Sequence, residues 1–332
     1  MTENTFTGKR VFVTGATGFL GGALAKRLIG EGAELSILAR SVEKAAHLAA
    51  QGVKVTIGKL SDDTAVEEAM RDCEIVFHVA AATTGAFEAQ WISNVEGTRT
   101  VMDAAAELRP QRVVHVSTIS VYGNHHFGNV SEDQAPGIGL NPYLRSKWAA
   151  ENVVRDISTA HDLEYAIIRP GMIYGAGSSM WTRTLFQLAR RNPLPFFGDG
   201  SGHAYPIHVD DVVDMMSVLA HHPEAKNEAF NCTPDPSPTW KEFLLEYAQY
   251  VGHQNWLSLP MPLAYGVAGA TMAFSNRNSI WRDLPDMINL IRYPITFKMD
   301  KALHLLDWSP KVDLHTGIAS CIPWLRAEGL LR

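Results

Sequence analysis

The chain has 332 residues, 46% of them hydrophobic and 19% charged, which is enough for one large domain or two joined ones. Its 29 basic and 35 acidic residues give a formal net charge of −6, so the basic excess typical of a dedicated nucleic-acid binder is absent and we expect no nucleic-acid partner. The amino terminus carries no apolar signal segment, and three widely spaced cysteines are typical of reduced thiols, so we expect a cytoplasmic protein.

Apolar runs alternate with helical patterns through the first 170 residues. We predict strands at residues 11–13, 34–39, 53–58, 74–79, 112–117 and 165–169. We predict helices at residues 23–29, 42–51, 62–70, 91–108 and 141–160. Strands that alternate with helices at this spacing form βαβ crossovers. The predicted fold class is therefore α/β, a Rossmann-type doubly wound parallel sheet with helices on both faces.

The first strand leads directly into a glycine series, Gly15, Gly18 and Gly21. Glycines allow a sharp turn and let a pyrophosphate approach backbone amides at the start of a helix. Such a series also closes ordinary strand–helix turns, but its place between a strand and a helix favours a dinucleotide site.

Beyond residue 169 the alternation ends, and a segment rich in Gly, Pro and aromatic residues follows. We predict a dinucleotide-binding domain at residues 1–170, with residues 207–231 packing back onto it. Residues 171–206 and 232–332 are predicted to form a smaller, mostly helical substrate-binding lobe. The apolar stretch 257–274 contains two prolines and is a poor membrane span, so we expect no integral membrane segment.

The residue that ends the second strand usually selects the cofactor in dinucleotide folds. An acidic side chain there binds a ribose 2′-hydroxyl, whereas a basic one suits a 2′-phosphate. Here Ala39 replaces the acid and Arg40 follows it. A guanidinium forms charge-assisted hydrogen bonds with phosphate, so NADP(H) is favoured and NAD(H) stays open.

Tyr143 and Lys147 are four residues apart in a predicted helix, which places both side chains on one face. A free phenol has a pKa near ~10, and a neighbouring ammonium lowers that value. Ser117 and Thr118 end the strand that precedes this helix. This arrangement favours a phenol that serves as an acid or base close to neutral pH. We predict no metal site.

Several motifs occur in a family order: TGATGFLGG, VFHVAA, NVEGT, HVSTISVYG, the Tyr143–Lys147 pair, RPGMIYG, HVDD and LDWSPKVDLHTGI. The chain thereby resembles an extended short-chain dehydrogenase/reductase of the NAD(P)-dependent epimerase/dehydratase group. It is most similar to the 3β-hydroxysteroid dehydrogenase and dihydroflavonol reductase branch. The resemblance implies an enzyme that transfers a hydride between the nicotinamide and a substrate carbon.

The resemblance also implies roles for individual residues. Tyr143 would be the general acid/base and Lys147 its pKa-lowering partner, with Thr118 bonding the substrate oxygen and Asn94 supporting the site backbone. The implied cofactor contacts are Gly15, Thr17, Gly18, Phe19, Leu20, Gly21, Arg40, Leu60, Ala80, Ala81, Ser117, Tyr143, Lys147, Pro170, Met172 and Ile173. The implied substrate contacts are Thr83, Thr118, Tyr143, Gly171, Trp181, Phe186 and Tyr205.

Three functions stay open. The first is an NADP-dependent oxidoreductase that interconverts a secondary alcohol and a ketone on a hydrophobic small molecule, such as a steroid, a flavonoid or an aromatic ketone. The second is a nucleotide-sugar epimerase or dehydratase; against it, Gly171-Met172 and His203 stand where such members carry Asn and Arg. The third is a non-catalytic NADP-binding regulator. Family members often form homodimers through helices equivalent to residues 91–108 and 141–160, and we expect the same here.

Overall fold

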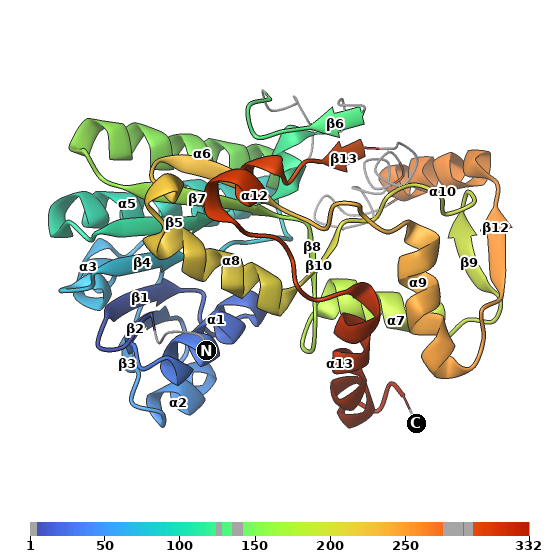
Figure 1. Cartoon of the computed structure of the whole chain (residues 1–332), viewed down its shortest axis with the longest axis horizontal. Helices are drawn as coiled ribbons and strands as arrows, with labels where there is room; N and C mark the ends of the chain where they lie inside the picture. Colours follow the sequence, from blue (N-terminus) through green and yellow to red (C-terminus); the bar gives the residue numbers. More distant parts are fainter. Residues whose placement is uncertain (1–4, 124–127, 135–141, 275–287, 289–294, 332) are drawn as a thin grey trace. The chain divides into compact units, whose positions relative to one another are not determined.

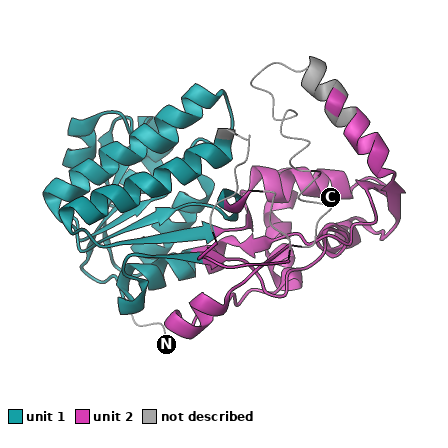
Figure 2. Ribbon diagram, turned by 90° about the horizontal axis from the view of Figure 1, so that it is seen from above, with its two compact units in different colours: residues 1–121, 142–169, 213–230 teal, residues 122–141, 170–212, 231–332 magenta. Residues whose placement is uncertain are grey.

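A computed structural model of the chain describes residues 5–123, 128–134, 142–274, 288 and 295–331. The chain forms two compact units, drawn in teal and magenta in Figure 2. Unit 1 comprises residues 1–121, 142–169 and 213–230, and unit 2 comprises residues 122–141, 170–212 and 231–332. Each unit is therefore assembled from segments that are far apart in the sequence.

Unit 1 is built on a seven-stranded parallel sheet with the strand order β3-β2-β1-β4-β5-β7-β11. The strands are β1 Arg10–Thr14, β2 Glu34–Ala39, β3 Lys54–Ile57, β4 Ile75–His78, β5 Arg112–Val116, β7 Tyr165–Pro170 and β11 Glu228–Cys232. β4, β5 and β7 are buried along their whole length, as expected for strands covered on both faces. The predicted Rossmann-type doubly wound sheet is confirmed.

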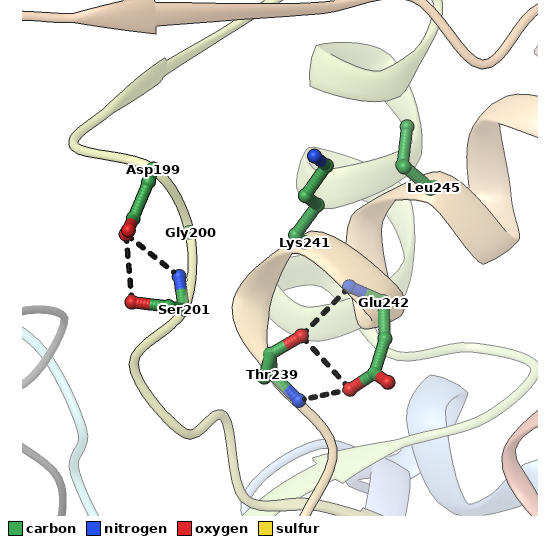
Figure 3. A pocket seen from close by; sticks show the side chains of 7 residues that line it. All are labelled: Asp199, Gly200, Ser201, Thr239, Lys241, Glu242 and Leu245. Carbon is green, nitrogen blue, oxygen red and sulfur yellow. Dashed lines mark hydrogen bonds between the residues drawn. The ribbon is translucent and has the colours of Figure 1, made fainter.

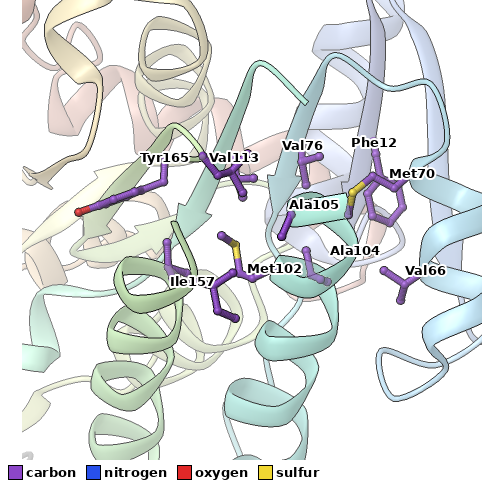
Figure 4. Close-up of a cluster of buried hydrophobic side chains, with 14 of the residues drawn as sticks. Phe12, Val66, Met70, Val76, Met102, Ala104, Ala105, Val113, Ile157 and Tyr165 are labelled. Atoms are coloured by element: carbon purple, nitrogen blue, oxygen red, sulfur yellow. The ribbon is translucent and has the colours of Figure 1, made fainter. Parts of the chain in front are cut away.

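Helices cover both faces of this sheet (Figure 1). They are α1 Phe19–Gly30, α2 Val42–Ala49, α3 Asp63–Met70, α4 Phe87–Trp91, α5 Gly97–Leu108, α6 Pro142–His161 and α8 Val209–His221. α5 packs against both α3 and α6, and a cluster of apolar side chains, including Phe12, Met102 and Ile157, is buried beneath them (Figure 4). Burial of apolar area at about 25 cal/mol per Å² holds this layer on the sheet.

Two elements of unit 1 differ from the sequence prediction. β11 was not predicted, and it adds a strand at one edge of the sheet. The predicted helix 91–108 is divided, because the π-helical turn η1, Ile92–Glu96, separates α4 from α5. A π-helical turn inserts one residue into the helical repeat, which hydrophobic periodicity does not show. Asn141, the predicted first residue of the helix 141–160, lies outside the described residues.

Unit 2 contains short elements. In the part of the chain that the structure describes, β8 pairs with β10, β9 with β12 and β6 with β13, all in parallel. These elements are β6 Gly128–Val130, β8 Met172–Tyr174, η3 Ser179–Thr184, α7 Leu185–Ala189, β9 Leu194–Phe197, β10 Pro206–His208, α9 Trp240–Ala248, β12 Trp256–Leu259, α10 Met261–Phe274, β13 Ile295–Phe297, α12 Asp300–Leu306 and α13 Leu314–Ala327. Residues 122–141 group with unit 2, rather than with the first 170 residues, because β6 pairs with β13. None of the described helices, the apolar α10 included, has the length and apolarity to cross a bilayer.

Candidate active site

The turn between β1 and α1 carries the glycine series. Gly15 has φ +76°, and a Cβ atom there would lie 2.8 Å from the backbone nitrogen of Ala80. A Cβ atom on Gly21 would lie 2.2 Å from the carbonyl oxygen of Gly15. Gly18 precedes α1 and provides no side-chain cap for the first helical N–H groups. A tight turn in front of an uncapped helix start fits a pyrophosphate group.

The other predicted cofactor contacts of unit 1 differ in exposure. Thr17 is exposed, Phe19 is half-buried and Leu20 is buried. Arg40 follows β2 directly and its side chain is exposed, so its guanidinium is open to a charged ligand.

Three further predicted cofactor contacts follow strands on either side of β1. Ala80 and Ala81 lie in the loop after β4, with Ala80 close to Gly15. Leu60 lies in the loop after β3 and packs partly against the core beneath α5. Much of its side chain is thereby used in packing.

Tyr143 and Lys147 lie one turn apart on α6 and therefore share a face. The Lys147 side chain is buried, and its ammonium donates a 2.6 Å hydrogen bond to the carbonyl oxygen of Val116 at the end of β5. Burial lowers the pKa of Lys147 to about 8, while the charge of Glu151 acts to raise it. Burial raises the pKa of Tyr143 to about 12. The Tyr143 hydroxyl is thus protonated at neutral pH, whereas the sequence predicted that Lys147 lowers its pKa.

A buried ionic cluster continues along α6. Glu151 has a fully buried side chain and accepts two hydrogen bonds from Arg169 of β7, at 3.0 Å on Oε1 and 2.7 Å on Oε2. Arg155 donates a third bond to Oε2 at 2.8 Å. Burial acts to raise the pKa of the Glu151 carboxyl, but hydrogen bonding to Arg169 and the charges of Arg169 and Arg155 hold it below its ordinary value.

Ser117 and Thr118 both follow β5, and their surroundings differ. The pKa of the Glu151 carboxyl is raised by burial and lowered mainly by Arg169 and Arg155. The Ser117 hydroxyl also lowers it, but by less than the two arginines do. The Thr118 hydroxyl accepts from the Ser120 backbone nitrogen at 3.2 Å and donates to the Ser120 hydroxyl at 3.3 Å. Ser120 is exposed. Of the Ser117 and Thr118 hydroxyls, the Thr118 hydroxyl is therefore the one bonded to a solvent-exposed residue.

Asn94 lies in the π-helical turn η1 and is 1% exposed. Its side-chain oxygen accepts a 2.7 Å hydrogen bond from the Ala82 nitrogen. Its side-chain nitrogen donates to the Ala82 carbonyl oxygen and to the Ser146 hydroxyl, both at 2.9 Å. Asn94 thereby joins the loop after β4 to α6 at Ser146, the residue before Lys147.

The predicted contacts at residues 170–173 fall in unit 2. The Gly171 nitrogen donates to the Cys232 carbonyl oxygen at 3.0 Å, and a Cβ atom on Gly171 would lie 2.3 Å from the Tyr205 carbonyl oxygen. Met172 is buried in β8, and Ile173 is half-buried there. Close packing within unit 2 therefore accounts for the glycine at position 171.

Phe186 and Tyr205 are core residues of unit 2, which differs from their predicted contact with a substrate. Both side chains are 0% exposed. The Tyr205 hydroxyl donates to a backbone carbonyl at 2.6 Å, and the Phe186 ring packs edge-on against Tyr247. Aromatic cores and aromatic pockets share one composition, so the sequence does not separate them. Trp181 is half-buried in η3, and Thr83 is exposed in unit 1.

A pocket in unit 2 lies at the start of α9 (Figure 3). The Ser201 nitrogen and hydroxyl donate to Asp199 at 3.0 and 2.7 Å, and Thr239 and Glu242 form a reciprocal capping box. These bonds stabilise a turn and a helix start, so we assign no ligand to this pocket. Within the described ranges, no group of three His, Cys, Asp or Glu side chains is placed to hold a metal ion.

Two residues beside Tyr143 and Lys147 on α6 were missed at the level of sequence: Glu151 and Ser146. Glu151 repeats the four-residue spacing of Tyr143 and Lys147, and this spacing is a usable signal. Ser146 carries no local signal, because its importance depends on Asn94 of another element.

A parallel sheet with a glycine turn after β1 and a Tyr–Lys pair on α6 defines an NAD(P)-dependent enzyme of the extended short-chain dehydrogenase/reductase type. The chain belongs to the NAD dependent epimerase/dehydratase family, whose sequence profile matches residues 11–233.

Two named relatives match this chain over nearly the whole of both sequences. The 4-hydroxy-2-methyl-3-oxo-4-farnesyl-3,4-dihydroquinoline-1-oxide ketoreductase of Stigmatella aurantiaca is 27% identical, over 93% of this chain and 94% of that protein. The ceramide reductase of Caulobacter vibrioides is 29% identical, over 97% of this chain and 96% of that protein. The crystal structure of UDP-glucuronic acid 4-epimerase from Bacillus cereus in complex with NAD matches with a TM-score of 0.76 at 20% identity, covering 96% of this chain and 99% of that one. This last similarity concerns the fold alone.

Proposed function

We propose that this chain is an NADP-dependent oxidoreductase that interconverts a secondary alcohol and a ketone on a hydrophobic small molecule. The observation that carries the proposal is the face shared by Tyr143 and Lys147 on α6, with Lys147 bonded to the end of β5. Thr118, two residues beyond that end, supplies a hydroxyl. The same residue types perform proton transfer at a carbonyl in chemistry of this kind.

In the proposed reduction, the Tyr143 hydroxyl gives its proton to the substrate oxygen as the alcohol forms. The Thr118 hydroxyl turns its hydrogen from the Ser120 hydroxyl to that oxygen and donates a second hydrogen bond, which stabilises the developing negative charge. Lys147 lies one helical turn from Tyr143, and its hydrogen bond to the Val116 carbonyl holds it there. Its positive charge stabilises the phenolate that remains after proton transfer.

The glycine turn and the start of α1 would hold the pyrophosphate of the dinucleotide, and Arg40 would hold a 2′-phosphate. When bound, the nicotinamide supplies or accepts the hydride.

We further propose that unit 1 is the dinucleotide-binding domain and unit 2 the substrate-binding domain, to which Trp181 contributes. A homodimer formed through α5 and α6 is proposed as well, and light scattering on the purified protein measures its mass.

The proposed substrate class rests on the names of the relatives. One is a ketoreductase of a farnesylated quinoline oxide and another is a ceramide reductase, so both names denote large apolar molecules. We expect the protein to oxidise NADPH with long-chain or aromatic ketones, and not to convert UDP-glucose to UDP-galactose. Absorbance of NADPH measures the first reaction, and chromatography of the nucleotide sugars measures the second. Epimerisation of UDP-glucose without any ketone reduction would contradict the proposal.

An Arg40→Asp variant is expected to lose roughly 10- to 100-fold in affinity for NADP(H), because it replaces a charge-assisted phosphate bond with repulsion. Affinity for NAD(H) should not fall. Fluorescence titration with both cofactors measures the ratio. Lys26→Asp is the matched control, since it makes the same charge change at an exposed residue of α1. An unchanged ratio in Arg40→Asp would remove the NADP assignment.

A nucleotide-sugar epimerase or dehydratase is the alternative, because a UDP-glucose 4-epimerase of Vibrio cholerae is 23% identical over 93% of this chain and 93% of that protein. Two observations weigh against it. Gly171 is packed against the Tyr205 carbonyl, and the His203 ring is bonded at 3.0 Å to the Ile295 carbonyl. Both positions, where nucleotide-sugar members carry Asn and Arg, are used in packing within unit 2.

A further inference from the structure

His78 is the last residue of β4 and is buried in unit 1. Its ring contacts two threonines from different elements. Nδ1 lies 2.8 Å from the Thr14 hydroxyl at the end of β1, and Nε2 lies 2.9 Å from the Thr98 hydroxyl on α5. A histidine that is bonded on both nitrogens can be neutral only if one nitrogen donates and the other accepts. Which nitrogen donates can be worked out from the neighbours.

The Thr14 oxygen accepts hydrogen bonds from the backbone nitrogens of residues 79 and 80, each at 3.1 Å. These two bonds use both lone pairs, so the Thr14 hydroxyl hydrogen points to His78 Nδ1. Nε2 then carries the imidazole hydrogen and donates it to the Thr98 oxygen. The Thr98 hydroxyl in turn donates to the Asn94 carbonyl at 2.6 Å. The hydrogen bonds therefore run in one direction, from Thr14 to His78, from His78 to Thr98 and from Thr98 to Asn94.

These bonds end at the Asn94 backbone carbonyl, and the Asn94 side chain makes a second set of bonds that leads to the proposed acid. Asn94 uses both hydrogens of its side-chain nitrogen, one on the Ala82 carbonyl and one on the Ser146 hydroxyl. Ser146 donates its own hydrogen to the Tyr143 carbonyl at 2.8 Å. The network thus joins the end of β1, which leads into the glycine turn, with the first turn of α6.

We propose that His78 is a neutral positioning residue, with its hydrogen on Nε2, that orients Asn94 and through it the Tyr143 end of α6. The role of Tyr143 rests on the proposed function, whereas the tautomer does not. Burial, together with the positive charge of Lys147, lowers the pKa of His78 to about 3, which agrees with a neutral ring. His115 pairs with His78 across β4 and β5, and neither of its ring nitrogens has a hydrogen-bond partner among the described residues.

Nitrogen NMR of histidine-labelled protein tests the tautomer without any substrate. His78→Asn identifies the His78 signals by their loss. We expect Nε2 to carry the hydrogen and Nδ1 to carry none, with no titration between about pH 5 and pH 9. A hydrogen on Nδ1, or a titration in that range, would overturn the proposal whatever reaction the protein catalyses.

Variants of the network test positioning. Thr98→Val removes the hydroxyl at nearly constant shape, and we expect kcat to fall roughly tenfold, the scale of one buried hydrogen bond, with NADP(H) affinity within about twofold. Thr98→Ser should restore kcat. His78→Asn keeps an acceptor near Thr14 but cannot reach Thr98, so it should lower kcat as much as Thr98→Val does. The double variant should be no worse than either single one.

His115→Asn is the matched control, because it removes an equally buried imidazole that makes no described hydrogen bond. We expect its kcat within about twofold of the wild type. Equal losses of kcat in His115→Asn and His78→Asn, or additive losses in the double variant, would show that the effect is general packing and would overturn the proposal. Should Thr98→Val fail to fold, the NMR result and the pair Thr98→Ser and His78→Asn still decide.

Discussion

A Tyr143→Phe variant is expected to lose ketone reduction by roughly 100- to 10,000-fold, the range of general acid catalysis. The substitution removes one hydroxyl and keeps the aromatic ring. Affinity for NADP(H) should change by less than about twofold, because the glycine turn and Arg40 are untouched. Steady-state rates and a cofactor titration measure the two quantities. A rate equal to that of the wild type would exclude Tyr143 as the acid.

Tyr205→Phe is the control for this prediction. It also removes one phenolic hydroxyl, but that hydroxyl is bonded to the Ile295 carbonyl in the core of unit 2. We expect about 1 kcal/mol less stability from the lost hydrogen bond and little change in rate. A large loss of rate with unchanged stability would instead return Tyr205 to the substrate contacts.

A Glu151→Gln variant is expected to lower the free energy of unfolding by about 3–5 kcal/mol. The carboxylate is fully buried and holds Arg169, whose side chain is also buried, through two hydrogen bonds. An amide is uncharged, so the variant removes the buried negative charge that lies next to that guanidinium. Urea denaturation measures the effect as a lower midpoint at an unchanged slope. A decrease in the free energy of unfolding of less than about 1 kcal/mol would contradict the prediction, because that is the range of an exposed ion pair.

Two variants separate the buried pair from charge effects in general. Lys9→Met breaks the half-exposed pair between Lys9 and Glu74, 2.7 Å apart, and should cost no more than about 1 kcal/mol. Glu151→Met combined with Arg169→Met removes both buried charges and should recover much of the lost stability. Burial lowers the pKa of Lys147 to about 8, a value that already includes the opposing effect of the Glu151 charge. Glu151→Gln should therefore shift the loss of the Lys147 charge to lower pH.

Local sequence patterns were enough to predict the βαβ order and several boundaries. β2 was predicted at residues 34–39 and occupies them, and Asp62 caps α3 through a 3.1 Å bond to the Ala65 nitrogen. The glycine turn also follows from local pattern, because its tight geometry is set by neighbouring residues. Helix spacing alone placed Tyr143 and Lys147 on one face.

By itself, the sequence determined the class of fold, the family and the residues at which to look for chemistry, because strand–helix alternation, turn glycines and a four-residue spacing act over short stretches of chain. Only the tertiary structure decided that Glu151 pairs with Arg169 and that Phe186 and Tyr205 belong to a core. It also decided the direction of the His78 hydrogen bonds. Each of these depends on contacts between residues distant in the chain, since burial and hydrogen-bond partners exist only once the elements have packed.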